Sequence, residues 1–91
     1  MNTPEAAPSG SVTDNTARSQ YEMDVAGQTV FARYRRQDDT TLILHVEAPP
    51  SLRGTGAADR FMQGLVALAA QQGTKLVPLC SYAVAWMKRH P

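Results

Sequence analysis

A short stretch, Arg53-Gly54-Thr55-Gly56-Ala57-Ala58, has the composition of an anion-binding turn. It lies between an extended apolar run and a long helical pattern, so it joins a predicted strand to the start of a helix. The first turn of a helix offers free N–H groups and the positive end of the helix dipole. The two glycines let a phosphate approach the backbone, and Arg53 adds a fork of donors. The stretch therefore predicts a phosphate site.

Two common phosphate-binding loops do not fit this stretch. The dinucleotide-binding pattern needs a third glycine where Asp59 stands, and the nucleoside-triphosphate loop needs a Gly-Lys pair that the sequence lacks. From the two glycines alone, a strand-to-helix turn without a ligand is an equally good interpretation. The surrounding elements and motifs must decide between them.

Length and composition restrict the class of protein. A chain of 91 residues forms one small domain, and a hydrophobic content of 43% is enough for a core. A net charge of +1, without a basic stripe and interleaved aromatic residues, argues against a dedicated nucleic-acid binder. Arg33 and Arg35 share one face of a predicted strand, which is typical of a solvated face.

The cellular setting follows from the cysteine count and the hydropathy pattern. Cys80 has no partner for an internal disulfide, which fits a reducing compartment. No apolar run approaches the roughly 20 residues of a membrane span, and the N-terminus lacks the pattern of a secretory signal. We therefore expect a cytoplasmic protein that does not insert into a membrane.

The chain divides into a tail and one domain. Residues 1–19 are rich in Ala, Pro, Ser, Thr and Asn, so we expect a disordered N-terminal tail and a folded domain over residues 20–91. Alternating apolar residues predict strands over residues 21–25, 28–36 and 40–47, joined by short turns into an antiparallel meander. In the third strand, alternation places Leu42, Leu44 and Val46 on one face, and Ile43, His45 and Glu47 on the other.

The second half of the chain predicts a helix, a strand and another helix. Apolar spacing indicates a helix over residues 56–72, which ends at Gly73, and Gly64 within it suggests a close packing contact. Residues 75–80 form a short apolar strand that should lie parallel to the third. Ser81 is a candidate N-cap for a last helix over residues 82–90. The fold class is therefore α+β.

In this order of elements, four motifs resemble the minimal, single-domain branch of the GNAT superfamily, the acetyl-CoA-dependent N-acetyltransferases. They are His45-Val46-Glu47-Ala48-Pro49, Arg53-Gly54-Thr55-Gly56, Pro78-Leu79-Cys80-Ser81-Tyr82 and His90-Pro91. Arg53, Gly56 and Ala58 also occupy the specified positions of the family's acyl-CoA motif, [Q/R]-x-x-G-x-[G/A]. Val46 and Ala48 depart mildly from the family pattern, which has Thr and Val there. The resemblance runs from about Tyr21 to the C-terminus.

The resemblance implies a GNAT-like fold, in which the fourth strand splays from the third and acetyl-CoA lies in the gap. The implied cofactor-binding residues come from the end of the third strand, the turn before the helix, and the end of the fourth strand: Val46, Glu47, Ala48, Arg53, Gly54, Thr55, Gly56, Ala57, Ala58 and Cys80. Backbone groups of the splayed strands would pair with the pantetheine arm, and the turn would hold the pyrophosphate. Acetyl-CoA would serve as a co-substrate, and no metal site is expected.

Three residues are candidates for catalysis. The resemblance carries the role of nucleophile to Cys80, although a lone cysteine is often a small buried apolar residue. His45 and Glu47 lie near the expected thioester, where either could be a general base, directly or through water. Tyr82 can protonate a leaving thiolate or simply pack, and packing is the favoured interpretation.

The predicted function is transfer of an acetyl group from acetyl-CoA to an unidentified amine. The alternative is an acyl-CoA-binding sensor or interaction module with little catalysis, because so small a chain has little wall for an acceptor pocket. The acceptor could be a protein N-terminus, a lysine, a polyamine or a small metabolite. We expect a monomer or a weak homodimer.

Overall fold

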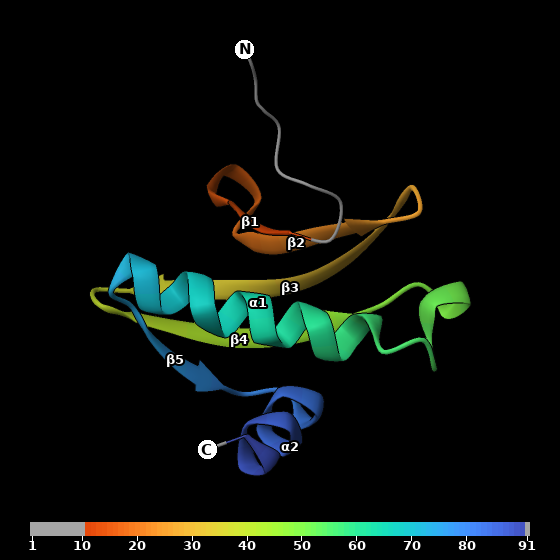
Figure 1. Ribbon diagram of the computed structural model, residues 1–91. Helices are drawn as coiled ribbons and strands as arrows, with labels where there is room; N and C mark the ends of the chain where they lie inside the picture. The colour runs from red at the N-terminus through yellow and green to blue at the C-terminus, as the bar shows by residue number, and fades with distance from the viewer. Residues whose placement is uncertain (1–10, 91) are drawn as a thin grey trace.

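A computed structural model describes residues 11–90 and contains one mixed sheet with two α-helices (Figure 1). The elements in chain order are β1 Val12–Asn15, the 3-10 helix η1 Thr16–Arg18, β2 Gln20–Val25, β3 Gln28–Gln37, β4 Thr40–Glu47, η2 Pro50–Leu52, α1 Ala57–Gln72, β5 Lys75–Pro78 and α2 Ser81–Arg89. The spatial order of the strands is β1-β2-β3-β4-β5, with the first four antiparallel and β5 parallel to β4. This is an α+β architecture.

The expected disordered tail is wrong for residues 11–19, and residues 1–10 lie outside the described part of the chain. Strand β1 pairs with β2 from Val12 opposite Met23 to Asn15 opposite Gln20. Polar contacts hold β1 in place. The Asp14 carboxylate accepts hydrogen bonds from the Tyr34 hydroxyl at 2.7 Å, Gln72 Nε2 at 2.8 Å and an Arg36 guanidinium nitrogen at 3.2 Å. A composition argument that counts apolar residues misses such a strand.

Gly64 explains how β1 packs on the helix. A Cβ atom at this position would lie 2.6 Å from the Cγ2 atom of Val12, which is too close for any side chain. The expected close packing contact is therefore confirmed, and its partner is the strand that the sequence did not reveal.

A β-bulge in β4 changes which side chains share a face. Arg33 pairs with His45 whereas Tyr34 pairs with Ile43, so Leu44 is an extra residue on β4. Ile43 is buried, and Leu44 and His45 are both exposed in succession. Because the bulge shifts the alternation, the predicted grouping of Leu42, Leu44 and Val46 on one face, with Ile43, His45 and Glu47 on the other, is wrong.

The bulge produces two distinct faces near the end of β4. Val46 and Ala48 now follow Ile43 on the α1 side and pack against the core. His45 and Glu47 lie on the opposite face and are exposed. Val46 and Ala48 therefore face the α1 side of the sheet, whereas His45 and Glu47, which alternate with them in the sequence, face the opposite side.

Strands β4 and β5 pair over only part of their length. The parallel register runs from Thr40 opposite Lys75 to Ile43 opposite Pro78, and the Leu79 N–H donates to the Ile43 carbonyl at 2.9 Å. From Leu44 to Glu47, β4 has no partner on this side within the described residues. The expected parallel pairing is confirmed, and the unpaired edge of β4 begins where Pro78 ends β5.

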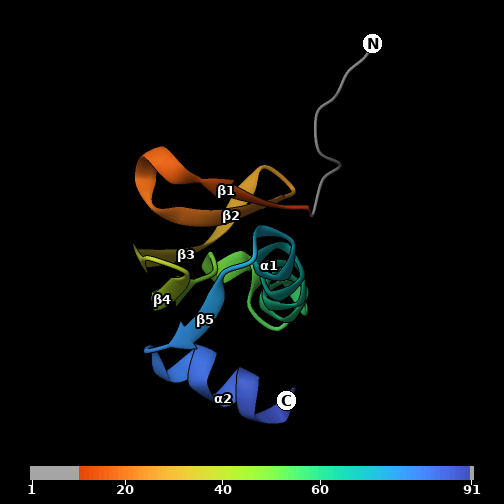
Figure 2. The same cartoon turned by 90° about the vertical axis from the view of Figure 1, so that its left-hand side faces the viewer.

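The core lies between the sheet and α1, with α2 completing it at the β5 edge (Figure 2). Its fully buried side chains include Tyr21, Met23, Val30 and Ile43 from the sheet and Phe61, Met62 and Leu65 from α1. Along β2 to β4, no α-helix of the described chain covers the opposite face of the sheet. No helix in the described chain is both long and apolar enough to cross a membrane.

The sequence predicted the residue that ends α1, but it did not predict the residue that caps α2. Gly73 ends α1 with φ of 73°, as its position predicted. The N-cap of α2 is Cys80 instead of Ser81, because the Cys80 Sγ accepts the Ala83 N–H at 3.4 Å. Ser81 is the first residue of the helix.

Asp14 provides a test of the β1 contacts. Its side chain is only 8% exposed. Burial opposes its charge, yet the hydrogen bonds from Tyr34, Gln72 and Arg36 outweigh burial and lower its pKa below the ordinary value. Asp14→Asn should destabilise the fold by about 1.5 kcal/mol at neutral pH, since bonds to a charged acceptor are lost. Asp38→Asn, in an exposed turn, is the matched control and should change stability little.

The pH dependence of the Asp14→Asn effect has a definite sign. A depressed folded pKa adds stability above the unfolded value of about 4, and this stability is lost as the pH falls through the folded pKa. Urea unfolding at neutral and acidic pH should therefore show the wild type and Asp14→Asn converging in acid. A constant difference across the range would contradict the role of the carboxylate charge.

Candidate active site

The turn between η2 and α1 needs both of its glycines. Gly54 has φ of 80° and Gly56 has φ of 83°, and both values are unfavourable for residues with a Cβ. Gly56 is also the N-cap of α1. A Cβ on Gly54 would meet nothing within 4 Å, and one on Gly56 would meet only an Arg60 guanidinium nitrogen at 3.5 Å. The backbone of this turn is therefore open to an approaching group.

Alternate amides of the turn are already used within the chain. The Arg53 N–H donates to the Pro50 carbonyl at 3.2 Å, the Thr55 N–H to the Leu52 carbonyl at 3.3 Å, and the Ala57 N–H to the Thr55 Oγ1 at 3.3 Å. Within the described chain, the N–H groups of the other three residues have no acceptor; these residues are Gly54, Gly56 and Ala58. The same three residues line a pocket. The site predicted for all six residues thus reduces to three available amides.

Charged side chains surround these amides. Arg53 donates from Nε to the Ala48 carbonyl at 3.4 Å, and Arg60 donates to the Thr55 carbonyl at 3.4 Å. Both arginines are exposed. With the positive end of the α1 dipole, they make this end of the helix attractive to an anion.

Asp59 also lines the pocket, but its carboxylate is engaged elsewhere. Its Oδ1 accepts the Trp86 indole N–H at 2.8 Å, and its Oδ2 accepts Gln63 Nε2 at 2.7 Å. The hydrogen bond from Trp86, supported by the one from Gln63, lowers the pKa of Asp59. The carboxylate therefore stays charged and ties α2 to the first turn of α1.

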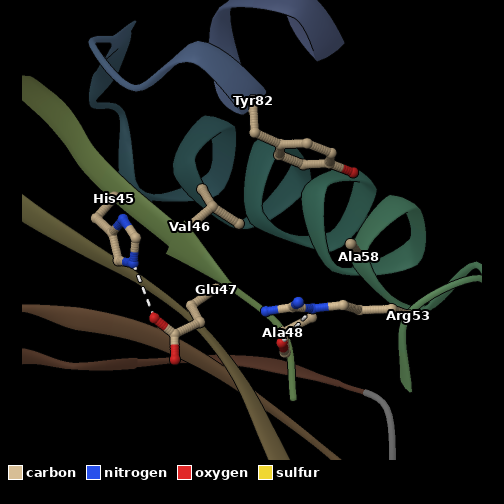
Figure 3. Close-up of a pocket in the computed structure, with 7 residues that line it drawn as sticks. All are labelled: His45, Val46, Glu47, Ala48, Arg53, Ala58 and Tyr82. Carbon is tan, nitrogen blue, oxygen red and sulfur yellow. Dashed lines mark hydrogen bonds and ion pairs between the residues drawn. The ribbon is translucent and has the colours of Figure 1, made fainter. Parts of the chain in front are cut away.

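Two adjoining pockets form one groove. The first, of about 330 Å³, is lined by Ala48, Leu52, Arg53, Gly54, Gly56, Ala58, Asp59 and Tyr82. The second, of about 300 Å³, is lined by His45, Val46, Glu47, Ala48, Arg53, Ala58 and Tyr82 (Figure 3). Four residues are common to both, so the groove runs from the turn before α1 to the unpaired end of β4.

Residues from both sides of β4 line the second pocket. Figure 3 shows His45 and Glu47 on one side of β4, and Val46, Ala58 and Tyr82 on the other. His45 Nε2 and Glu47 Oε1 are 3.0 Å apart, and about half of each side chain is exposed. Where β4 parts from β5, the second pocket therefore brings the turn before α1 next to the His45–Glu47 pair on the free side of the sheet.

Packing was the favoured sequence interpretation for Tyr82, and the structure places this residue at the groove. It lines both pockets from the first turn of α2, and 36% of the residue is exposed. Partial burial raises the pKa of its hydroxyl, and the negative charge of Asp59 adds to the increase. The hydroxyl therefore keeps its proton and can donate it. Its place two residues after Cys80, within the motif, was the available signal.

Cys80 lies apart from this groove. It lines neither pocket, its sulfur caps α2, and its side chain packs partly against the core. Thr55 and Ala57 also line neither pocket, since Thr55 bonds within the turn and Ala57 is fully buried. The structure thus brings together His45, Val46, Glu47, Ala48, Arg53, Gly54, Gly56 and Ala58, and leaves three predicted site residues outside.

The turn with the three available amides lies along the same groove as the end of β4, where the pairing with β5 has ended. The model of a family described as GCN5-related N-acetyl-transferase matches residues 20–91. The chain belongs to the GCN5-related N-acetyltransferase family. This membership supports acetyltransferase activity in general terms and confirms the resemblance. The matched range begins at β2 and leaves β1 outside. No curated protein matches the chain.

The proton on Tyr82 can be followed directly. In the acetyltransferase labelled with ¹³C at the tyrosine ζ carbon, NMR titration should place the pKa of Tyr82 above the ordinary value of about 10. Asp59→Asn should lower it, because the variant removes a nearby negative charge. Tyr34, whose pKa is raised to about 12 by burial and Asp14, is the internal reference and should not respond. A Tyr82 pKa unchanged by Asp59→Asn would refute the electrostatic link.

Proposed function

We propose that this protein transfers the acetyl group of acetyl-CoA to a primary amine. One observation carries the proposal. Three unengaged amides, those of Gly54, Gly56 and Ala58, lie at the positive end of α1 in a groove that continues to the His45–Glu47 pair. Such an arrangement suits a long ligand with an anionic end and a reactive end.

The anionic end of acetyl-CoA fits the turn. The diphosphate would accept hydrogen bonds from the three amides, and Arg53 would contribute charge from the other wall. From there, the groove leads past Ala48 to Val46. The β4 backbone at Val46 lacks a β5 partner, so it can pair with the amide-rich pantetheine arm as a short added strand.

The reactive end would reach the opening between β4 and β5. There the nitrogen of a neutral amine attacks the acetyl carbonyl carbon, a C–N bond forms, and the C–S bond to the thiol breaks. Glu47, directly or through water, takes the proton that the amine loses, with His45 orienting its carboxylate. Tyr82 gives its proton to the departing thiolate and recovers one from solvent. The products are an N-acetyl amide and free CoA.

Direct attack by the amine is favoured over an acetyl-cysteine route. Cys80 lies outside both pockets, and its sulfur already accepts a hydrogen bond from the α2 backbone. A nucleophilic cysteine would have to leave the cap before it could reach the thioester. We therefore assign Cys80 a structural role, and the catalytic role expected from the resemblance is the alternative that the experiments below separate.

CoA binding tests the turn. Gly56→Ala and Gly73→Ala form a matched pair, because both glycines flank α1 with positive φ and each variant introduces similar backbone strain of about 1–2 kcal/mol. Gly56→Ala should weaken CoA at least tenfold by calorimetry, since it displaces an amide that faces the groove. Gly73→Ala, at the far end of the helix, should bind CoA as the wild type does. Equal affinity in both variants would refute the phosphate assignment.

Kinetics of acetyl transfer test the assigned roles. Glu47→Gln removes the proton acceptor at constant shape and should reduce kcat about a hundredfold with unchanged CoA affinity. Cys80→Ser replaces the capping sulfur with a hydroxyl oxygen that can also accept the Ala83 N–H, and it should keep kcat within a few-fold. If Cys80→Ser lost most transfer while it still bound CoA, the cysteine would be the nucleophile. If acetyl-CoA bound saturably but no amine caused the release of CoA, the protein would instead be a binding module.

A further inference from the structure

Four side chains form a compact block on the free face of the sheet, beside the opening between β4 and β5. Phe31 and Arg33 project from β3, and their cross-strand partners on β4 are Glu47 and His45. The Phe31 and His45 rings lie diagonally across the block, with centroids 6.3 Å apart. The block contains a carboxylate–imidazole pair, an aromatic ring and a guanidinium group, all accessible from solvent or partly so.

Arg33 has no acidic partner in this block. Its Cζ lies 5.8 Å from the centre of the Phe31 ring, and it forms no ion pair within the described residues. Glu22, across Phe31 on β2, is engaged by the Asn15 and Gln20 amides at 3.2 and 2.6 Å. In contrast, Arg36 on the core side is paired with Asp14. The Arg33 guanidinium therefore lies over the Phe31 ring, and its N–H donors are available to a ligand.

This inference rests on the proposed function and concerns the acceptor. We infer that the acceptor is a small primary amine that carries a carboxylate, as an α-amino acid does. Its amine lies at the Glu47–His45 pair, its carboxylate binds the Arg33 guanidinium, and its side chain lies against Phe31. Arg33 is directly opposite His45, about 5 Å away between Cβ atoms, so one small molecule spans both groups.

The guanidinium groups on β3 argue against a polycation that extends from the block along this strand. Arg33 and Arg35 lie on the same face of β3, so a second ammonium group placed beside either of them would meet like charge. A carboxylate on the acceptor reverses this interaction, and a guanidinium binds carboxylates in a geometry that an ammonium does not match. The transfer itself is unchanged: the amine gains the acetyl group, Glu47 receives its proton, and CoA leaves as the thiol.

The experiment compares matched acceptors. Each of the common amino acids is offered with acetyl-CoA beside its carboxamide, which keeps the amine and removes the negative charge, and spermidine represents polycations. For the amino acids that are used best, kcat/KM should exceed that of the carboxamide at least tenfold. Spermidine should be a poorer acceptor than these amino acids.

Variants then locate the preference. Arg33→Gln should lower kcat/KM for the acid ten- to a hundredfold, leave the carboxamide within about threefold, and leave the KM of acetyl-CoA unchanged. Arg33→Lys should restore part of the loss. Arg35→Gln, two residues along the same face and opposite Leu42, is the matched control and should act as the wild type does.

The outcomes separate this inference from the proposed function. Acetylation of carboxamides or spermidine as fast as of the acids, or equal effects of Arg33→Gln and Arg35→Gln, would overturn the carboxylate site and leave acetyl transfer standing. Transfer to none of these amines by protein that binds acetyl-CoA would overturn both. A carboxylate preference that vanishes only in Arg33→Gln supports the inference.

Discussion

The separation of β4 from β5 is the constraint on which the rest of the site depends. Their pairing ends at Ile43 and Pro78. The bulge at Leu44 then shifts the alternation of the following side chains of β4 by one residue. Val46 is thereby left with an unpaired backbone edge toward the groove, and His45 and Glu47 are carried to the opposite face. Had the alternation continued unbroken, the His45–Glu47 pair and the turn before α1 would lie on the same face. In the proposed reaction, the opening lets the amine and acetyl-CoA approach the same point from different sides.

A second constraint fixes α2 relative to α1. The Trp86 indole donates to Asp59, and the His90 ring stacks on Trp86 with centroids 3.9 Å apart and planes at 12°. His90 Nδ1 also lies 2.9 Å from the Trp86 carbonyl oxygen. Asp59 lies in the first turn of α1, next to the available amides, and Tyr82 lies one helical turn before Trp86. The same contact therefore sets the distance between the available amides before α1 and the Tyr82 hydroxyl, and it gives the Asp59 carboxylate a structural role at this end of the groove.

The sequence predicted the strand–turn–helix junction, the parallel fifth strand and both helices, because each of these depends on neighbouring residues: apolar spacing, glycine conformation and proline. It did not predict β1, whose stability depends on Asp14 meeting Tyr34, Arg36 and Gln72 and on Val12 meeting Gly64. Nor did it predict the bulge, since alternation has no local marker for an extra residue at Leu44. Of the predicted site, the structure places the turn before α1 and the end of β4 along one groove. Cys80 lies outside the two pockets as a helix cap, a role that its place in the sequence does not distinguish from that of a nucleophile. Tyr82 lines the groove, although an aromatic residue near a core is usually a packing residue.

The open face of the sheet has a direct consequence for the proposed acceptor site. The core lies on the α1 side of the sheet, and along β2 to β4 no described α-helix covers the other side. Within the described chain, selectivity for the proposed acceptor would come from the few side chains that β3 and β4 project there. Burial contributes little on such an open face, so directional contacts to charge must contribute more. In the proposed acceptor site, the Glu47–His45 pair and the Arg33 guanidinium would provide two such contacts, at a spacing set by the pairing of β3 with β4.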